Sequence, residues 1–169
     1  MVLKNKYINK IETILRKIVY ESLNEMNFER RKDPLGALGV GRRKMIEDWL
    51  DEMGIMHYTI NDDMTIDTNS NVSIYTQKSH EKSLVKFPDF IQFNEVNGWF
   101  DCGYNSLVSL RGCSKVVKAN FNCIHNDLEY LEGCPEIVNG YFRCHDNKVE
   151  FTKEYVLSLC DVRKNWIIN

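Results

Sequence analysis

The sequence repeats itself with a period of 21 residues, and this repetition constrains the fold more than any other feature. The segments VNGWFDCGYNSLVSLRGC, VKANFNCIHNDLEYLEGC and VNGYFRCHDNKVEF begin at Val96, Val117 and Val138 and align without a gap. The recurring positions hold a phenylalanine, a cysteine, an asparagine and an aliphatic residue: Phe100, Phe121 and Phe142; Cys102, Cys123 and Cys144; Asn105, Asn126 and Asn147; Leu107, Leu128 and Val149. So many matches without an insertion predict one structural unit used repeatedly.

Each copy has the pattern of a short strand followed by a turn. Phenylalanine and cysteine alternate with polar residues, which is the periodicity of a strand with one buried face. The asparagine suits a bend, because its amide can bond backbone groups that the bend leaves unpaired. We expect Leu110 and Leu131 to fill the opposite wall, and Gly112 and Gly133 to let the chain double back. One copy cannot hide its own apolar face, so the copies must stack and align their asparagines in a ladder.

This repeat resembles the leucine-rich repeat, whose core pattern is L-x-x-L-x-L-x-x-N-x-L. Phe100, Cys102, Asn105 and Leu107 occupy the last four marked positions, and the next copies match likewise. The first marked position departs, because the valine that opens each copy lies one residue too early. The resemblance implies an α+β fold, namely a short leucine-rich-repeat-like parallel β-solenoid of about four coils with N-terminal helices and a C-terminal capping helix. Its repeats would span about 72–151.

The stretches on either side of the clear copies carry signals of their own. A degenerate copy of the repeat precedes them, with 71–74 as its strand, 83–88 as its opposite wall and an insertion between the two. Upstream, 57–67 alternates around two aspartates and predicts a β-hairpin. Downstream, 152–164 has the apolar spacing of a helix, which is expected to cap the end of the stack.

The N-terminal part is predicted to form an arm, residues 1–44, ahead of a repeat-bearing domain, residues 45–169. Apolar residues from Ile8 to Met26 step by three and four, as in an amphipathic helix of about twenty residues. Its apolar stripe either packs on its own domain or docks on a partner. The stretch NFERRKDPLGALGVGRRK that follows is interpreted as a loop, because Pro34 and its glycines interrupt any period. The candidate contact residues of the arm are Ile11, Leu15, Ile18, Arg30, Arg31, Arg42 and Arg43.

The expected loop carries six basic residues against two acidic ones, so salt-dependent, unspecific contact with nucleic acid is a further hypothesis. Gly36 and Gly41 have the spacing of a phosphate-binding loop, but two arginines follow and no apolar strand precedes them. We therefore do not predict nucleotide binding. Beyond the loop, Met45–Met53 predicts a short helix, with Gly54 at the C′ position and Ile55 making the accompanying apolar contact.

The layout of the chain resembles proteins of large tailed bacteriophages, the crAss-like gut phages among them. The segments that carry this resemblance are NFERRKDPLGALGVG, WLDEMGI, YTINDDMTID and the L-x-x-L-x-G-C-P repeats. The resemblance transfers no activity residue by residue. It implies a phage-encoded virion or accessory protein with a leucine-rich-repeat-like solenoid.

Composition argues against several classes of protein. A net charge of −2 gives no global attraction to nucleic acid or to an anionic membrane. No run approaches the roughly eighteen apolar residues of a membrane span, and the first residues lack the apolar region of a signal peptide. We therefore expect a protein of the phage virion or the host cytoplasm, neither secreted nor bound to a membrane. Its six cysteines would then remain thiols, the default in a reducing compartment.

Neither a metal site nor a catalytic site is predicted. The cysteines recur at intervals of ten or eleven residues, unlike the close pairs of zinc sites, and are interpreted as small apolar core residues. Asp67–Asn71 imitates the start of a calcium loop but lacks the later glycine and glutamate. His125 and His145 occupy neighbouring positions of successive copies, and no serine or aspartate is placed with them to suggest a triad. We expect no enzyme activity, no cofactor and no small-molecule substrate.

The remaining candidate for function is a surface. In leucine-rich-repeat-like strands the polar positions face the concave side, and here they include aromatic and charged residues. The set indicates a protein-binding patch. The alternative is that these are only the exposed residues that any short solenoid has on its strands, without a binding role. The candidate residues are Trp99, Asp101, Asn122, Ile124, Tyr141, Arg143 and His145. Two hypotheses follow for a non-enzymatic protein–protein interaction module: a virion protein anchored through its arm, or an accessory protein that binds a host or phage protein through this face.

Overall fold

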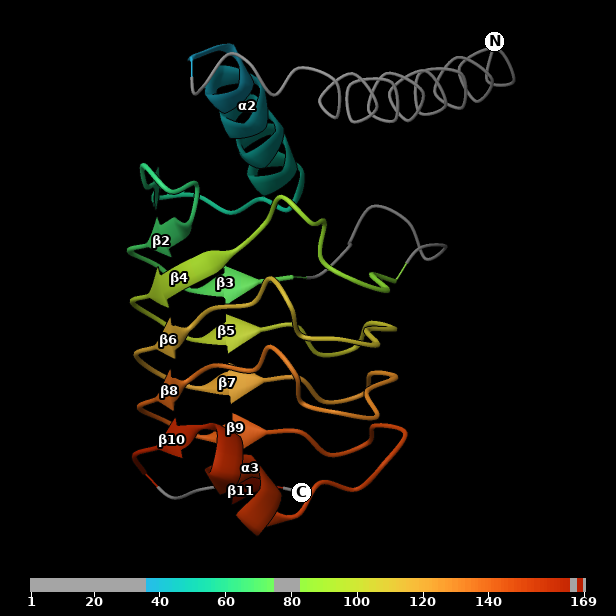
Figure 1. The fold of residues 1–169 in the computed structure, drawn as a ribbon. Coiled ribbons are helices and arrows are strands. Elements are labelled where there is room, and N and C mark those ends of the chain that lie inside the picture. Colours follow the sequence, from blue (N-terminus) through green and yellow to red (C-terminus); the bar gives the residue numbers. More distant parts are fainter. Residues whose placement is uncertain (1–35, 75–82, 165–166, 169) are drawn as a thin grey trace, which may run out of the picture. The chain divides into compact units, whose positions relative to one another are not determined.

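The computed structural model describes residues 36–74, 83–164 and 167–168. Over these residues the chain is an α+β protein with two helices and two β-sheets, and all described strands belong to the compact unit Gly41–Asn169. Helix α2 (Gly36–Glu52) precedes all the described strands, and helix α3 (Lys153–Leu159) precedes only the last two of them. Figure 1 shows the strands of this unit as two parallel ladders. The predicted combination of helices with parallel strands is thereby confirmed.

The strands divide between two sheets, and from β2 onward successive strands alternate between them. The first sheet contains, in spatial order, β1 (Tyr58–Ile60), β2 (Ile66–Thr68), β4 (Phe93–Val96), β6 (Val116–Val117), β8 (Ile137–Val138) and β10 (Asp161–Val162). The second contains β11 (Ile167–Ile168), β9 (Phe142–Arg143), β7 (Phe121–Asn122), β5 (Phe100–Asp101) and β3 (Val72–Ser73). Neighbours pair in parallel except β1 and β2, which form the predicted hairpin.

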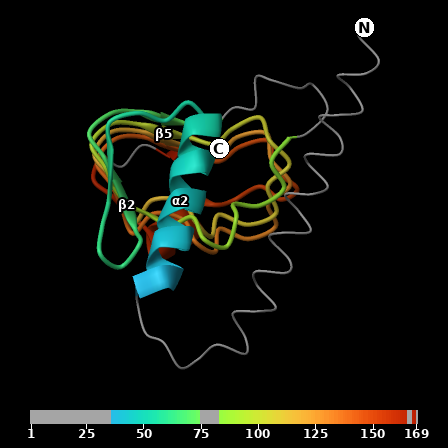
Figure 2. The ribbon, with the colours of Figure 1, turned by 90° about the horizontal axis from the view of Figure 1, so that it is seen from above.

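The register of the central strands places equivalent residues of successive sequence copies side by side. In the second sheet Phe100 pairs with Phe121, and Phe121 pairs with Phe142. In the first sheet Val116 pairs with Ile137 in the same way. Each pair joins residues 21 positions apart. Successive passes of the chain therefore superimpose when the unit is viewed from above (Figure 2).

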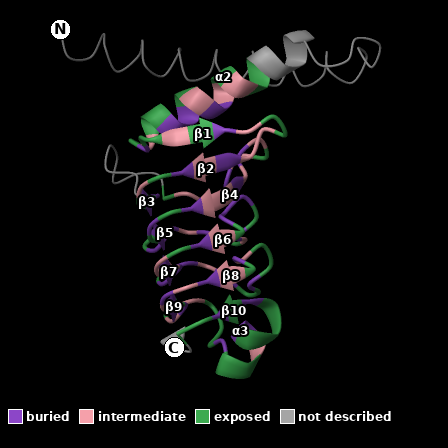
Figure 3. Cartoon of the chain, turned by 90° about the vertical axis from the view of Figure 1, so that its left-hand side faces the viewer, coloured by how far each residue is buried: buried purple, intermediate pink, exposed green. Residues whose placement is uncertain are grey.

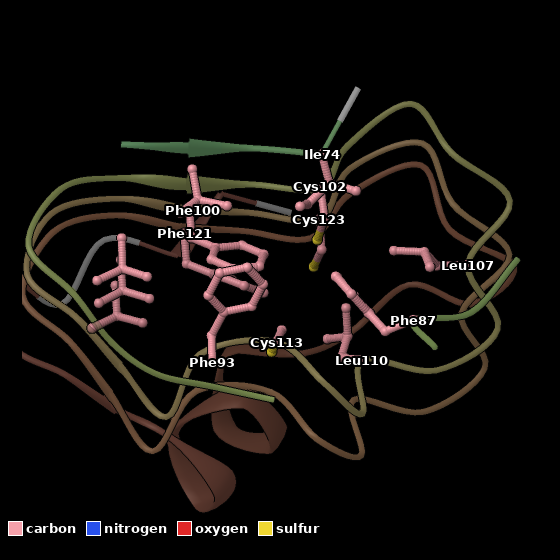
Figure 4. Close-up of a cluster of buried hydrophobic side chains, with 14 of the residues drawn as sticks. Ile74, Phe87, Phe93, Phe100, Cys102, Leu107, Leu110, Cys113, Phe121 and Cys123 are labelled. Atoms are coloured by element: carbon pink, nitrogen blue, oxygen red, sulfur yellow. The ribbon is translucent and has the colours of Figure 1, made fainter. Parts of the chain in front are cut away.

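The core lies between the two sheets and is built from the recurring apolar positions. The first residue of β5, β7 and β9 is buried and the second is at least partly exposed. Figure 3 shows buried residues recurring along the whole stack of strands. Phe100 and Phe121 stack with ring centroids 5.8 Å apart, and Phe93 from the first sheet meets Phe100 edge-on at 5.4 Å (Figure 4). Leu107 and Leu110 are fully buried beside them. Each such side chain stabilises the fold by about 1.5–3 kcal/mol.

The cysteines belong to this core, which confirms their interpretation as small apolar residues. Five of the six are buried and Cys134 is partly buried against the same cluster. None forms a disulfide. The thiols of Cys102 and Cys123 donate to the carbonyl oxygens of Asn122 and Arg143, each 3.4 Å away. Burial raises the pKa of Cys144 to about 12, so its thiol stays protonated at neutral pH.

Helix α2 corrects one expectation. The glycine-rich stretch up to Lys44 was expected to be a loop, but the helix includes all residues from Gly36 to Glu52. Ile46 and Leu50 are fully buried and hold one end of the helix in the core. Once such an anchored turn exists, each further residue adds a backbone hydrogen bond, so glycines with a penalty of about 1 kcal/mol each remain helical.

The end of α2 has the predicted geometry. Gly54 adopts a φ of 69°, and its N–H donates to the carbonyl oxygen of Asp51. The N–H of Ile55 donates to Leu50 O at 2.9 Å, and the Ile55 side chain is buried. These two bonds form a Schellman motif, in which glycine accepts the left-handed backbone at no steric cost.

The C-terminal region contains the predicted helix and two strands that were not predicted. Thr152 caps α3 by accepting a hydrogen bond from the N–H of Tyr155, and Val156 is fully buried. Beyond the helix, β10 pairs with β8 and β11 with β9, so each sheet gains one more strand. Strands of two residues show no periodicity that could reveal them in a sequence. The amphipathic helix expected before residue 36 and the insertion at 75–82 lie outside the described residues.

Candidate functional site

The outward face of the second sheet carries a row of polar side chains at paired positions of successive strands. Asp101, Asn122 and Arg143 occupy paired positions on β5, β7 and β9. The amide of Asn122 donates to Asp101 Oδ1 at 3.0 Å, and the same oxygen accepts the N–H of Gly103 at 2.9 Å. The side chains of Asp101 and Asn122 are therefore held in place by hydrogen bonds, and the Asp101 carboxylate has a fixed position on this face.

Beside this row lies a shallow hollow of about 210 Å³. It is lined by Trp99, Phe100, Asp101, Asn120, Asn122 and Arg143, and we call it the Trp99 hollow. Trp99 directly precedes β5 and is 38 % exposed, which leaves a large apolar area of its side chain open to a partner. Its backbone N–H donates to Asn71 Oδ1 at 3.0 Å, and the N–H of Tyr141 donates to Asn120 Oδ1 at 2.9 Å. These bonds fix the backbone on both sides of the hollow.

Four of the seven predicted patch residues come together in the hollow, and the other three do not line it. Trp99, Asp101, Asn122 and Arg143 line the hollow, whereas Tyr141 is partly buried next to it.

Ile124 was expected to be exposed, which is wrong: it is only 8 % exposed. A Cβ added to Gly103 of the preceding copy would lie 3.2 Å from Ile124 Cγ1. The isoleucine therefore fills the space that this glycine leaves open.

His145 lies beyond the strand, in the bend that follows it. Each such bend is held by the recurring asparagine: Asn147 donates to the carbonyl oxygens of Cys144 at 2.8 Å and of Cys123 at 3.1 Å. The side-chain oxygen of Asn147, Oδ1, accepts the N–H of Leu128 at 3.3 Å. The amide thus joins two successive copies, as the predicted ladder requires.

The residue before each of these asparagines has a left-handed backbone. Tyr104, His125 and Asp146 have φ values of 56°, 50° and 55° and occupy equivalent positions. The rings of Tyr104 and His125 stack with centroids 4.5 Å apart. His125 Nε2 lies 3.3 Å from Asp146 Oδ2, and His145 Nδ1 lies 2.5 Å from the same oxygen. We call His125, His145 and Asp146 the histidine–aspartate cluster.

Sequence reasoning missed this cluster because it compared the two histidines with each other. Asp146 occupies the position in the next copy that is equivalent to His125, and His145 directly precedes Asp146 in the chain. The alignment of the copies therefore contained the signal, since stacked equivalent positions become neighbours in space.

The predicted arm residues are described only in part. Arg43 donates to the carbonyl oxygen of Ile60 at 3.1 Å, so it is tied to the hairpin of its own domain. Arg42 is exposed and lines a second hollow together with Arg111 and Glu132. The others, namely Ile11, Leu15, Ile18, Arg30 and Arg31, lie outside the described residues.

Comparison with known proteins assigns neither a family nor a function. No protein-family model, no curated protein and no solved structure matches the chain. Among the helices of the described residues, none has the length and apolar content needed to cross a membrane.

Proposed function

We propose that this protein is a non-enzymatic protein–protein interaction module built on a short leucine-rich-repeat-like solenoid. The solenoid proposal is supported by the alternation of strands between two sheets and by the pairing of residues 21 positions apart in both. It is further supported by the asparagine amides that join successive bends. Stacked repeats of this kind offer an extended surface whose outward residues vary freely.

The observation that carries the binding proposal is the Trp99 hollow. Tryptophan and arginine are the residue types most enriched at the energetic centres of protein interfaces, and here Trp99 and Arg143 line one hollow. Asp101 and Asn122 also line the hollow and supply hydrogen-bonding groups there. A partner would insert a side chain between the indole and the guanidinium group and complete its hydrogen bonds on the polar row.

Site-specific photo-crosslinking tests this proposal. A photoreactive phenylalanine analogue replaces Trp99 in the full chain, and a matched protein carries it at Tyr130, an exposed aromatic residue outside the hollow. Both are expressed in host cells during infection by the phage that the sequence resemblance implies, and crosslinked proteins are identified by mass spectrometry. We expect one partner captured through position 99 and not through position 130, and lost when Arg143→Ala is added. Equal capture at both positions contradicts binding at the hollow.

The place of the module in a phage is a proposal that rests on the sequence resemblance. In one version the protein is a virion component held through residues 1–44, and in the other it acts in the infected cell through the hollow. Mass spectrometry of purified virions separates them: stoichiometric copies support the first version, and absence refutes it.

A further inference from the structure

The histidine–aspartate cluster brings three metal-ligating side chains from two successive copies to one point. One ligand atom from each of His125, His145 and Asp146 lies within 4.8 Å of the other two. Elsewhere in the described part of the chain, no set of three histidine, cysteine or carboxylate groups converges in this way. We propose that this cluster is a binding site for a divalent first-row transition cation such as Zn²⁺.

The donor set selects the class of ion. Two imidazole nitrogens and one carboxylate oxygen suit Zn²⁺, Cu²⁺, Ni²⁺ and Co²⁺, whereas Ca²⁺ and Mg²⁺ require sites made of oxygen. A carboxylate at the centre of the set also excludes anions such as phosphate, since Asp146 Oδ2 contacts both histidines. Three protein ligands leave one tetrahedral position open to water.

Two of the three distances between ligand atoms differ by less than 1 Å from those of a loaded site, and the third is at most 4.8 Å. With bonds of about 2.0–2.1 Å, the ligand atoms of a tetrahedral zinc site lie about 3.4 Å apart. The distance from His125 Nε2 to Asp146 Oδ2 is 3.3 Å and needs no adjustment. The contact of 2.5 Å between His145 Nδ1 and Asp146 Oδ2 has to widen by somewhat less than 1 Å, which rotation of the exposed Asp146 side chain permits.

The backbone that carries the ligands is held independently of any ion. Asn126 donates to the carbonyl oxygen of Ile124 at 3.1 Å, and Asn147 donates to that of Cys144 at 2.8 Å, so both bends are pinned from inside. The stacked ring of Tyr104 limits the motion of His125. A ligand set on fixed backbone loses less conformational freedom on binding, which favours affinity.

A bound ion would join two successive copies on the outside of the bend, where their amide ladder already joins them on the inside. Because His125 precedes His145 by 20 residues and Asp146 by 21, the ion would close a loop that is open in the unfolded protein. Binding to the folded state alone raises stability by mass action. The spacing of the cysteines had predicted no metal site, and we depart from that expectation because the ligands here are two histidines and an aspartate.

Isothermal titration calorimetry with ZnCl₂ on the full, reduced chain tests the proposal. The variants are His125→Asn, His145→Asn and Asp146→Asn, since asparagine tolerates a left-handed backbone and these positions are exposed or partly exposed. His57→Asn and His80→Asn, at the other two histidines of the chain, serve as matched controls. Circular dichroism verifies that every variant is folded.

We expect one Zn²⁺ per chain, with the dissociation constant weakened at least about tenfold in each cluster variant and unchanged in both controls. In parallel, Co²⁺ should give a tetrahedral visible spectrum without the sulfur-to-metal charge-transfer band of a thiolate ligand. The proposal is overturned by an absence of binding at millimolar Zn²⁺, by binding that survives the cluster variants, or by a thiolate band in the Co²⁺ spectrum.

Discussion

The side-chain amide of Asn126 donates a hydrogen bond to the carbonyl oxygen of Cys102, 3.0 Å away and 24 residues earlier in the chain. The same amide donates to the carbonyl oxygens of Cys123 at 3.2 Å and Ile124 at 3.1 Å within its own bend. Its oxygen accepts the N–H of Leu107 at 2.9 Å. One buried side chain thus bonds four backbone groups of two successive bends.

We predict that Asn126→Ala lowers the free energy of unfolding by about 3 kcal/mol or more. Each buried backbone group left without a partner costs about 1–3 kcal/mol, and no alanine atom can replace these bonds. Urea denaturation in the presence of a chelator measures the loss. Asn97→Ala is the control, because Asn97 is exposed and its amide makes a single bond, to Asn69 Oδ1 at 3.0 Å; it should change stability by less than about 0.5 kcal/mol. Similar losses in both variants contradict the prediction.

The sequence predicted the inside of the molecule better than its surface. Phe121, Cys123 and Asn126 could be assigned to the core and the bend because each recurs in the neighbouring copies at a fixed spacing. The burial of Ile124 could not be predicted, because it depends on the glycine that the preceding copy has at the equivalent position. The alternation of apolar and polar residues along one strand does not report which residue the neighbouring strand has beside it.

Two further features depended on contacts that no local pattern reports. The helical state of the glycines before Lys44 follows from packing at the other end of α2, where Ile46 and Leu50 enter the core. The convergence of His125 with Asp146 required the stacking of equivalent positions, with a left-handed backbone at both. In each case tertiary structure decided what propensity and spacing left open.

We predict that Gly41→Ala stabilises the protein by about 0.8–1 kcal/mol, the difference in helix propensity between the two residues. Gly41 lies inside α2, and a Cβ added there meets nothing within 4 Å. Urea denaturation and the ellipticity of the folded protein measure the effect, and both should increase. An unchanged or lowered stability would indicate that this segment is the loop that its glycines predict.

Gly133→Ala should act in the opposite direction and lower stability by about 2 kcal/mol or more. The residue has a φ of 86°, and an added Cβ would lie 2.5 Å from the backbone nitrogen of Arg111 in the preceding copy. Backbone cannot move aside as the end of a side chain can, so strain and clash add together. The same denaturation experiment compares this variant directly with Gly41→Ala, and a loss below about 0.5 kcal/mol contradicts the close approach.

Stability should fall at acidic pH partly through Asp67. Burial raises the pKa of this carboxyl, but hydrogen bonds from the amides of Asn61 and Asn94 and from the N–H of Glu95 outweigh it, so the pKa lies below its ordinary value. A folded-state pKa below the unfolded-state value of about 3.9 stabilises the folded protein at pH values above that unfolded-state pKa. This stabilisation is lost as the pH falls through the folded-state pKa. In the Asp67→Asn variant, the free energy of unfolding should therefore fall less steeply as the pH drops below about 4.5. Asp62→Asn, exposed in the same hairpin, controls for the removed charge.

The thiols give a last prediction, on reactivity. Burial raises the pKa of every cysteine, least for Cys134, to about 11, and to about 12 for Cys144 and Cys160. At pH 8 even Cys134 would be a thiolate in only about one molecule in a thousand, and only the thiolate attacks a disulfide reagent. A chromogenic disulfide reagent at pH 8 should therefore react slowly with the native protein and titrate six thiols at once in denaturant, because no cysteine is in a disulfide. Two or fewer thiols in denaturant would refute the assignment of these residues to a reduced core, and rapid reaction of the native protein would refute their burial.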